Sequence, residues 1–248
     1  MDLTALGTSG AWPGAGRAAS GYLLRHDGFR VALDLGTGTL SRLQQLIDLK
    51  DLDGIVISHA HYDHFLDLYP LFVARFFHPE ELPPIPVLAP NGFFDYFCRL
   101  TEDEGKDMPS VFECRELGFG QETDLGPFRI RTWEMTHLVP TIGVRLQADG
   151  TSVAYTGDTG PTDEVEALAR GTDLLLSEAA LQDMNEPPWF HLTARQAGEY
   201  ARRAEVPSLV LSHFWPTADR DLSREQAAEV YQGDLTMFEE GDTVEVGS

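Results

Sequence analysis

Ser58-His59-Ala60-His61-Tyr62-Asp63-His64 carries the strongest fold signal of the chain, with four potential metal ligands within six residues. It directly follows Asp53-Gly54-Ile55-Val56-Ile57, an apolar β-branched run typical of a buried strand. α/β enzymes often present functional side chains on loops that a rigid sheet holds in place. Imidazoles suit zinc and related transition metals, and the carboxylate adds a charged oxygen ligand. Four ligands on one ion would leave it no reactive position, so the loop suggests a site divided between two metal ions.

The length and charge of the chain limit its function. The chain has 248 residues, with 40 acidic and 18 basic side chains and a net charge of −22. This length is enough for an α/β domain with a full core, and we find no linker-like tract, so we predict a single domain over residues 1–248. The acidity repels polyanions and no Lys/Arg cluster offers a phosphate-binding stripe, so nucleic-acid binding is not expected.

Neither a signal peptide nor a membrane span is expected. The first residues, Met1-Asp2-Leu3-Thr4-Ala5-Leu6-Gly7, lack a basic segment followed by a long apolar stretch. No apolar run approaches the roughly eighteen residues of a membrane helix. Cys98 and Cys114 lie far from the histidine loop and form no metal-binding pair, as expected of reduced thiols. We therefore expect a cytoplasmic protein with no membrane partner.

The apolar runs predict strands that are followed by alternating strands and helices, an order that indicates helices packed outside a sheet core. The predicted strands are Asp2–Leu6, Tyr22–Arg25, Phe29–Asp34, Gly54–Ser58, Ile85–Ala89, Phe128–Glu134, Gly143–Gln147, Ser152–Thr156, Asp173–Ser177 and Ser208–Ser212. Helices are predicted at Thr39–Asp48, Leu66–Phe76 and Gly92–Leu100. Three more have start signals: Thr162 before two acidic residues, and capping boxes at Thr193/Gln196 and Ser223/Gln226.

Apolar runs that each stop at an ionisable residue recur five times along the chain. The residues at these ends are His59, His137, Asp158, Glu178 and His213. If those strands run in the same direction, their ends converge on one edge of the sheet. We therefore predict one shared site there.

These residues resemble the metallo-β-lactamase superfamily of binuclear hydrolases over essentially the whole chain. The motifs that resemble its ribonuclease Z-like branch are Gly7-Thr8-Ser9-Gly10, Leu33-Asp34-Leu35-Gly36-Thr37-Gly38, Tyr155-Thr156-Gly157-Asp158-Thr159, Ser177-Glu178-Ala179 and His191-Leu192-Thr193-Ala194. The resemblance implies an α/β fold, a four-layer αββα sandwich of two mixed sheets flanked by helices. It also implies a site along one edge of the paired sheets.

The resemblance further implies a ligand set for two divalent ions, zinc in the first place and manganese or iron as alternatives. His59, His61 and His137 would hold one ion, Asp63, His64 and His213 the other, and Asp158 would bridge them. Two such ions about 3.5–4 Å apart can share a hydroxide whose pKa falls to near 7. Asp63 could also accept a hydrogen bond from that hydroxide and orient it.

Glu178 and His191 form the predicted catalytic pair beside Asp63. His191 lies two residues before the Thr193 cap, and helix-end N–H groups favour a nearby phosphate oxygen. A histidine held by a glutamate would protonate a departing ribose oxygen, as orienting carboxylates do for other catalytic imidazoles. The alternative is that Glu178 merely ends a strand and His191 is a loop residue.

Two departures from the branch pattern indicate a small substrate. Relatives that process transfer RNA usually have glycine at the positions of Tyr62 and Asp67, and a long arm between the third and fourth metal motifs. Here Asp158 follows His137 by only 21 residues (158 − 137), too few for an arm. The variant Ser-His-x-His-x-Asp-His-x-x-Asp, with Gly7–Gly21 and the helix Leu71–Arg75, resembles bacterial cyclic-nucleotide phosphodiesterases of this superfamily. That resemblance implies hydrolysis of a small phosphodiester, 3′,5′-cyclic AMP or a related cyclic nucleotide.

Other interpretations stay open. The first rival is a ribonuclease Z-like tRNA 3′-processing endonuclease, and a lactone or thioester hydrolase is weaker because it would leave Glu178 and His191 without a purpose. A silent binding module is disfavoured by the complete ligand set. Asp67 either orients a ligand histidine or starts a helix. Trp12, Phe214 and Trp215 either stack on a base or pack in the core or at the lip, and the run Phe93–Phe97 forms either a homodimer face or core.

Overall fold

Two seven-stranded sheets pack face to face in the computed structural model, which describes residues 1–99, 101, 106–182 and 190–247. The strand order of the first sheet is β14 (Thr243–Glu245), β1 (Asp2–Gly7), β2 (Gly21–His26), β3 (Phe29–Leu35), β4 (Gly54–Val56), β5 (Ile85–Pro90), β6 (Phe112–Leu117). The order of the second is β13 (Asp234–Met237), β12 (Ser208–Ser212), β11 (Leu174–Glu178), β10 (Thr151–Tyr155), β9 (Ile142–Ala148), β8 (Phe128–Glu134), β7 (Glu122–Leu125).

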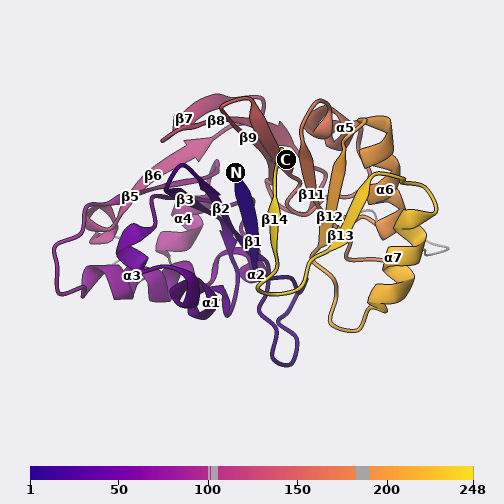
Figure 1. Ribbon diagram of the computed structural model, residues 1–248. Helices are drawn as coiled ribbons and strands as arrows, with labels where there is room; N and C mark the ends of the chain where they lie inside the picture. Colours follow the sequence, from indigo (N-terminus) through magenta and orange to yellow (C-terminus); the bar gives the residue numbers. More distant parts are fainter. Residues whose placement is uncertain (100, 102–105, 183–189, 248) are drawn as a thin grey trace.

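Helices cover the outer face of each sheet (Figure 1). Those on the first sheet are α1 (Thr39–Leu46), α2 (Tyr62–Phe65), α3 (Leu68–Phe76) and α4 (Phe93–Cys98). Those on the second are α5 (Asp163–Ala169), α6 (Ala194–Arg203) and α7 (Arg220–Ala228). Short 3₁₀ turns lie at Leu49–Asp51 and Met108–Ser110. The predicted αββα sandwich of two mixed sheets is confirmed.

The continuous apolar runs have a simple cause, because the central strands are covered on both faces. In β11, Leu174 and Leu176 face the layer between the sheets, while Leu175 packs under the helices of the second sheet. Alternation along a strand therefore buries every side chain when both faces are covered. No described helix is both long and apolar enough to span a membrane.

All ten predicted strands are present, with ends that shift by one or two residues. Four strands of the described chain were not predicted, and each is the edge of a sheet: β6, β7, β13 and β14. Phe93 and Phe97 of the aromatic run on α4 are buried in the core, whereas Phe94 and Tyr96 are only partly buried. A homodimer stays a prediction.

The helix starts agree with the sequence in two cases of three. Thr162 caps α5, and Thr193 with Gln196 forms the capping box of α6. The capping box predicted at Ser223 is wrong, because α7 begins at Arg220 and Asp219 caps it. Ser223 lies inside the helix, where its hydroxyl donates to the carbonyl of Asp219. The helix predicted at Leu66–Phe76 is α3, which begins two residues later, at Leu68, whereas the short helix α2 before it was not predicted. Leu100 lies outside the described residues.

Strand direction brings the predicted ends together. β10, β11 and β12 are parallel neighbours, and β8 has the same direction because β9 pairs antiparallel with both β8 and β10. The residues that follow these four strands therefore meet at one edge of the second sheet. Between His137 and Asp158 the chain forms only the β9–β10 hairpin, whose turn is Asp149-Gly150. No arm protrudes from this described segment.

Candidate metal centre

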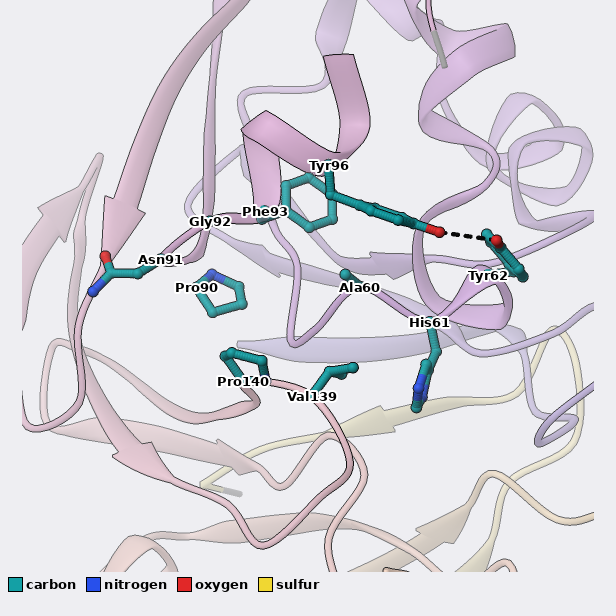
Figure 2. Close-up of a pocket in the computed structure, with 10 residues that line it drawn as sticks. All are labelled: Ala60, His61, Tyr62, Pro90, Asn91, Gly92, Phe93, Tyr96, Val139 and Pro140. Carbon is teal, nitrogen blue, oxygen red and sulfur yellow. Dashed lines mark hydrogen bonds between the residues drawn. The ribbon is translucent and has the colours of Figure 1, made fainter. Parts of the chain in front are cut away.

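The histidine loop leaves β4 and enters the single-turn helix α2. Its start is fixed by a buried carboxylate, since the backbone N–H and the hydroxyl of Ser58 both donate to Asp34 at 2.7 Å. The short helix then buries Asp63 and His64 side by side, while His61 stands at its N-cap. His61 also borders a cavity that is lined by residues of α4 and of the loop after His137 (Figure 2).

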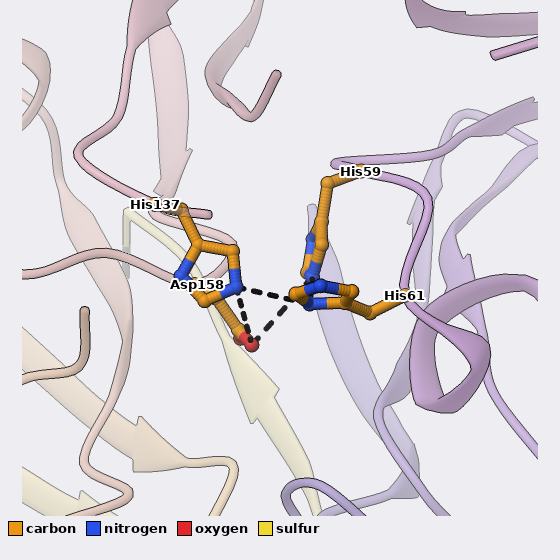
Figure 3. A group of neighbouring side chains, drawn as sticks. All are labelled: His59, His61, His137 and Asp158. Carbon is orange, nitrogen blue, oxygen red and sulfur yellow. Dashed lines mark hydrogen bonds and ion pairs between the residues drawn. The ribbon is translucent and has the colours of Figure 1, made fainter. Parts of the chain in front are cut away.

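Four side chains from three loops form what we call the cavity-side group: His59, His61, His137 and Asp158 (Figure 3). Their potential ligand atoms all lie within 4.8 Å of one another. His61 Nδ1 is 3.1 Å from His59 Nε2 and 3.0 Å from His137 Nε2. Asp158 Oδ2 lies 3.6 Å from His59 Nε2 and 3.8 Å from His137 Nε2. Three imidazoles and one carboxylate oxygen thus surround a common point.

A second set, which we call the buried group, consists of Asp63, His64, Asp158 and His213. Asp158 Oδ1 lies 3.2 Å from His64 Nε2 and 3.3 Å from His213 Nε2. Asp63 Oδ2 lies 3.5 Å from His64 Nε2 and 3.9 Å from His213 Nε2. All four side chains are buried. This second point is surrounded by two imidazoles and two carboxylates.

Asp158 divides its two oxygens between the groups, with Oδ2 toward the cavity-side group and Oδ1 toward the buried group. The bend before it depends on Gly157, whose φ is +59° and whose missing Cβ would lie 2.8 Å from the Cβ of Ser58. Only glycine adopts that backbone readily. A carboxylate in this position can bridge two cations and offset part of their charge.

The donor atoms fit a cation. Within the described chain, His64 Nε2, His213 Nε2 and Asp158 Oδ1 are buried and have no hydrogen-bond partner. A buried polar atom without a partner costs free energy, so such atoms are rare in folded proteins. Both nitrogens lie within 3.3 Å of the carboxylate oxygen, a closeness expected of ligands that share one ion. Nitrogen and carboxylate oxygen are the donors that zinc and related divalent ions accept.

Four of the ligand histidines are anchored through the ring nitrogen that faces away from the groups. His64 Nδ1 lies 2.7 Å from Asp34 Oδ2, and His213 Nδ1 lies 2.7 Å from the hydroxyl of Ser20. His59 Nδ1 lies 2.9 Å from the Ser58 hydroxyl, and His137 Nδ1 lies 2.8 Å from a backbone carbonyl. A proton held on Nδ1 leaves the lone pair of Nε2 for a metal.

Asp34 is the functional residue that sequence reasoning missed. It is fully buried and also accepts a hydrogen bond of 2.6 Å from the hydroxyl of Tyr155. The motif that contains it was recognised, but no role was given to its carboxylate. A signal was present, since Asp34 lies near the end of an apolar strand, as the five ionisable residues do.

The charges of the two groups act on one another. Burial and the neighbouring His64 lower the pKa of His59 well below its usual value, which keeps that imidazole neutral. Burial also opposes the charged form of His64, but Asp158, Asp63 and Asp34 outweigh it and raise the pKa of His64. Burial would raise the pKa of Asp63, yet His64 and His213 hold it below the usual range. Asp63 is therefore ionised at neutral pH.

The glycine-rich segment after β1 closes one side of the centre. The backbone N–H of Ala11 donates to Asp63 Oδ2 at 2.7 Å, which fixes that carboxylate. Gly10 lies directly against His213, and a Cβ there would be 2.6 Å from the imidazole Cδ2. Only glycine allows the backbone so close. This contact explains the glycine that ends the motif Gly7-Thr8-Ser9-Gly10.

Glu178 and His191 form a pair beside the shared aspartate. Glu178 is buried, and its oxygens accept from the backbone N–H groups of Thr159 at 2.6 Å and Ala180 at 3.3 Å. His191 Nδ1 lies 3.1 Å from Glu178 Oε1 and 3.9 Å from Asp158 Oδ2. Burial would lower the pKa of His191, but the charge and hydrogen bond of Glu178 raise it to about 9. The ring is therefore protonated and oriented next to the centre.

The structure brings together all nine residues that the sequence selected for the site, including Glu178 and His191. Two open assignments are now decided. Asp67 does not orient a histidine; it accepts from the backbone N–H of Leu40 at 2.8 Å and so caps α1, while Asp34 is the residue that orients His64. Phe214 is buried in the core of the second sheet's helices and cannot stack on a base.

Trp12 and Trp215 form a lip of the metal centre, beside His191. Their ring centroids are 6.1 Å apart, and Trp215 meets His191 edge to face at 6.3 Å. Trp12 is 43% exposed, so it contributes surface rather than core. These two indoles therefore border the side of the centre where the Glu178–His191 pair stands.

Two groups of imidazoles and carboxylates that share one aspartate, set at the joint edge of an αββα sandwich, define a metallohydrolase. Comparison with known proteins agrees with this class of protein. A family model described as "Beta-lactamase superfamily domain" matches residues 30–214, and the chain belongs to this superfamily. Membership implies divalent metal ions, which the two groups fit.

Relatives match over nearly the full chain. An uncharacterized protein of Mycobacterium leprae is 34% identical and covers 99% of this chain and 89% of its own length. A ribonuclease Z of Mycolicibacterium gilvum is 30% identical over 88% of this chain and 85% of its own. The crystal structure of the metallo-β-lactamase fold protein YhfI of Bacillus subtilis superimposes with a TM-score of 0.89 at 26% identity, over 98% and 99% of the two chains. The chain is thus similar to a protein named ribonuclease Z and to YhfI, which is named a probable metallo-hydrolase.

Proposed function

We propose that the chain is a metal-dependent phosphodiesterase that opens 3′,5′-cyclic AMP or a related cyclic nucleotide to the monophosphate. The observation that carries this proposal is the position of Asp158, which divides its oxygens between two ligand groups and has His191 Nδ1 3.9 Å from Oδ2. Zinc is the first expectation for both ions. We assign His59, His61 and His137 to one ion, Asp63, His64 and His213 to the other, and Asp158 to both.

The Glu178–His191 pair favours a phosphodiester over a lactone or thioester. A protonated imidazole is useful where an alkoxide leaves a phosphorus centre, because that oxygen needs a proton as its bond breaks. The pair has the parts of an orienting carboxylate and a catalytic imidazole, at 3.1 Å. A relative named ribonuclease Z, 30% identical, supports phosphodiester chemistry for the same site.

Each side chain has a role in the proposed mechanism. Bound divalent ions would lower the pKa of a water molecule and offset the charge that gathers on the phosphoryl oxygens. Asp63, fixed by the Ala11 N–H, accepts a hydrogen bond from the attacking water and aims its lone pair at phosphorus. The new P–O bond forms as the bond to the ribose oxygen breaks, and His191 gives that oxygen its proton. The proton that the water loses then restores His191.

A small substrate is favoured over an RNA. The net charge of −22 opposes a polyanion, whose affinity depends on Lys and Arg contacts to phosphates. Between His137 and Asp158 the described chain forms only a hairpin, so it offers no arm for a transfer RNA. The rival function, a tRNA 3′-processing endonuclease, rests on the relative's name and on the shared ligand pattern.

The test is a substrate screen with purified protein and added Zn²⁺ or Mn²⁺. We expect the highest kcat/KM for a cyclic nucleotide, compared with bis(p-nitrophenyl) phosphate, a precursor transfer RNA, a lactone and a thioester. A higher value for the precursor RNA would establish the nuclease instead. Hydrolysis of the lactone or thioester without any phosphodiester would contradict the role given to Glu178 and His191.

A further inference from the structure

A cavity of about 410 Å³ adjoins the metal centre through His61. This size falls in the range of pockets that bind small molecules. His61 belongs to both sites, because its Nδ1 faces His59 and His137 while the residue also lines the cavity. A ligand held at the centre and a group bound in the cavity would therefore both contact His61.

The cavity has two apolar walls (Figure 2). Phe93 and Tyr96 of α4 form one wall, and Val139 and Pro140, from the loop after His137, form the opposite one. Ala60 lies between them, and Pro90 extends the second wall. None of the described residues that line the cavity is acidic, lysine or arginine. Such surroundings suit a flat, uncharged group that stacks on an aromatic ring.

Tyr62 closes the end of the cavity next to the metal centre. Its hydroxyl accepts a hydrogen bond of 2.9 Å from the hydroxyl of Tyr96, which joins the histidine loop to α4. The two hydroxyls are thus engaged with one another, and the rings are what a ligand would meet. Tyr62 is 57% exposed, so this tyrosine is at the mouth and not in the core. It is one of the two positions at which the sequence departs from the branch pattern.

We infer that this cavity is the subsite for the planar base of the cyclic-nucleotide substrate. The inference rests on the proposed function and adds the part of the substrate that is recognised. In a nucleotide the base is joined to the phosphate through one ribose, and here a stacking cavity is joined to the phosphate-binding centre through one side chain, His61. The lip formed by Trp12 and Trp215 does not line this cavity; it lies beside His191, where the leaving oxygen receives its proton.

The same walls predict weak discrimination between bases. Asn91 is the one amide of the lining, and its side chain points away from the cavity (Figure 2). Stacking tolerates any base because every base has a π-face. Apolar pockets separate similar ligands by about 10- to 200-fold, whereas buried hydrogen-bonding groups reach far higher ratios. We therefore expect kcat/KM for cyclic AMP and cyclic GMP to agree within about tenfold.

The test compares cyclic AMP with 1-deoxyribose 3,5-cyclic phosphate, which has the same ring phosphate and no base. Tyr96→Ala removes one wall and Val139→Phe fills the space between the walls, so both variants should lower kcat/KM for cyclic AMP about tenfold, mainly through KM. Hydrolysis of the base-free substrate should be unchanged. Asp95→Ala, on the exposed face of the same helix α4, is the matched control and should change neither substrate. The two variants change the cavity volume in opposite directions, so a folding defect in one of them would leave the other as a valid test.

A binding measurement separates the inference from the proposed function. Titration calorimetry of the metal-loaded protein with adenosine should show binding that Tyr96→Ala and Val139→Phe weaken. If the wild type hydrolyses both ring phosphates equally and the variants change nothing, the base subsite is wrong and the phosphodiesterase stands. If adenosine binds in the expected way but no phosphodiester is hydrolysed, the proposed reaction is wrong and the base subsite is supported. Equal losses on both substrates would show a structural role only and overturn the inference.

Discussion

The buried group and the cavity-side group share Asp158 but differ in surroundings and in donors. The buried group is enclosed by protein and has two carboxylates, whereas His61 of the cavity-side group borders an open cavity and this group has only the shared carboxylate. The anchors differ as well, since His64 is held by the buried carboxylate of Asp34 and His137 by a backbone carbonyl. The buried half is therefore built to keep an ion, and the cavity-side half combines ion binding with access for a substrate.

Asp158→Ala should have the largest effect, because it acts on both groups at once. It removes the one carboxylate that both groups use, and it leaves Asp63 as the only carboxylate of the buried group beside His64 and His213. We expect loss of both ions and of all detectable hydrolysis, measured by elemental analysis and by assay. Asp124→Ala, an exposed aspartate on the edge strand β7, is the control and should keep both ions. Two metal equivalents in Asp158→Ala would contradict the bridging role.

His61→Ala should separate the two halves. It removes a ligand from the cavity-side group and leaves the four residues of the buried group intact. We expect the metal content, measured by elemental analysis, to fall from two equivalents to one. The fold should be preserved because His61 is only partly buried. The same substitution at the fully buried His64 should release the other ion and also lower the stability. Loss of both ions in His61→Ala would show that the halves do not bind independently.

His191→Ala should lower turnover without the loss of an ion. The imidazole lies beside Asp158 but is assigned to proton transfer, a contribution of about 10²- to 10⁴-fold to the rate. We expect a kcat reduced by that factor with metal content unchanged. The kcat for a substrate with a good leaving group, such as bis(p-nitrophenyl) phosphate, should fall less, because its leaving oxygen needs no proton. Retained activity together with loss of metal would refute the assignment.

Asp34→Asn should have a smaller effect, because it removes no ligand and disturbs only the orientation of His64 and, through Ser58, of His59. The carboxylate accepts from Ser58, His64 and Tyr155, and an amide cannot accept at both of its heteroatoms. Loss of such an orienting group typically weakens metal affinity about 10- to 100-fold, which a competition titration with a chromophoric chelator would measure. Asp67→Asn is the matched control, because Asp67 caps α1 and should leave the affinity unchanged. Equal affinities for the Asp34 and Asp67 variants would contradict the distinction between the two carboxylates.

The sequence predicts the central strands and not the edges, for a physical reason. β11 reads as an unbroken apolar run because both of its faces are buried. The edge strand β7, Glu122–Leu125, buries only its last residue, so no apolar period marks it. The same holds for Thr243–Glu245, whose residues are exposed or half-buried. Edge strands are defined by a neighbour distant in the chain, and local pattern does not contain that neighbour.

In the candidate site, too, local features could be predicted from the sequence and contacts between distant segments could not. The histidine loop and the strand ends are local signals, so the sequence alone selects the ligands and the Glu178–His191 pair. The supporting contacts are not local: Asp34 meets Tyr155, 121 positions later, and Ser20 meets His213, 193 positions later. Asp67 was undecided because its partner, Leu40, is 27 positions earlier. The cavity walls also come from distant segments, so the base subsite could not be predicted from sequence.

Anomalous diffraction from a crystal of the metal-loaded protein is the most direct check that one aspartate joins two cation sites. The expected map has two peaks about 3.5–4 Å apart, one among His59, His61 and His137 and the other among Asp63, His64 and His213, with one carboxylate oxygen of Asp158 toward each. A single peak, or two peaks that do not share Asp158, would contradict the account.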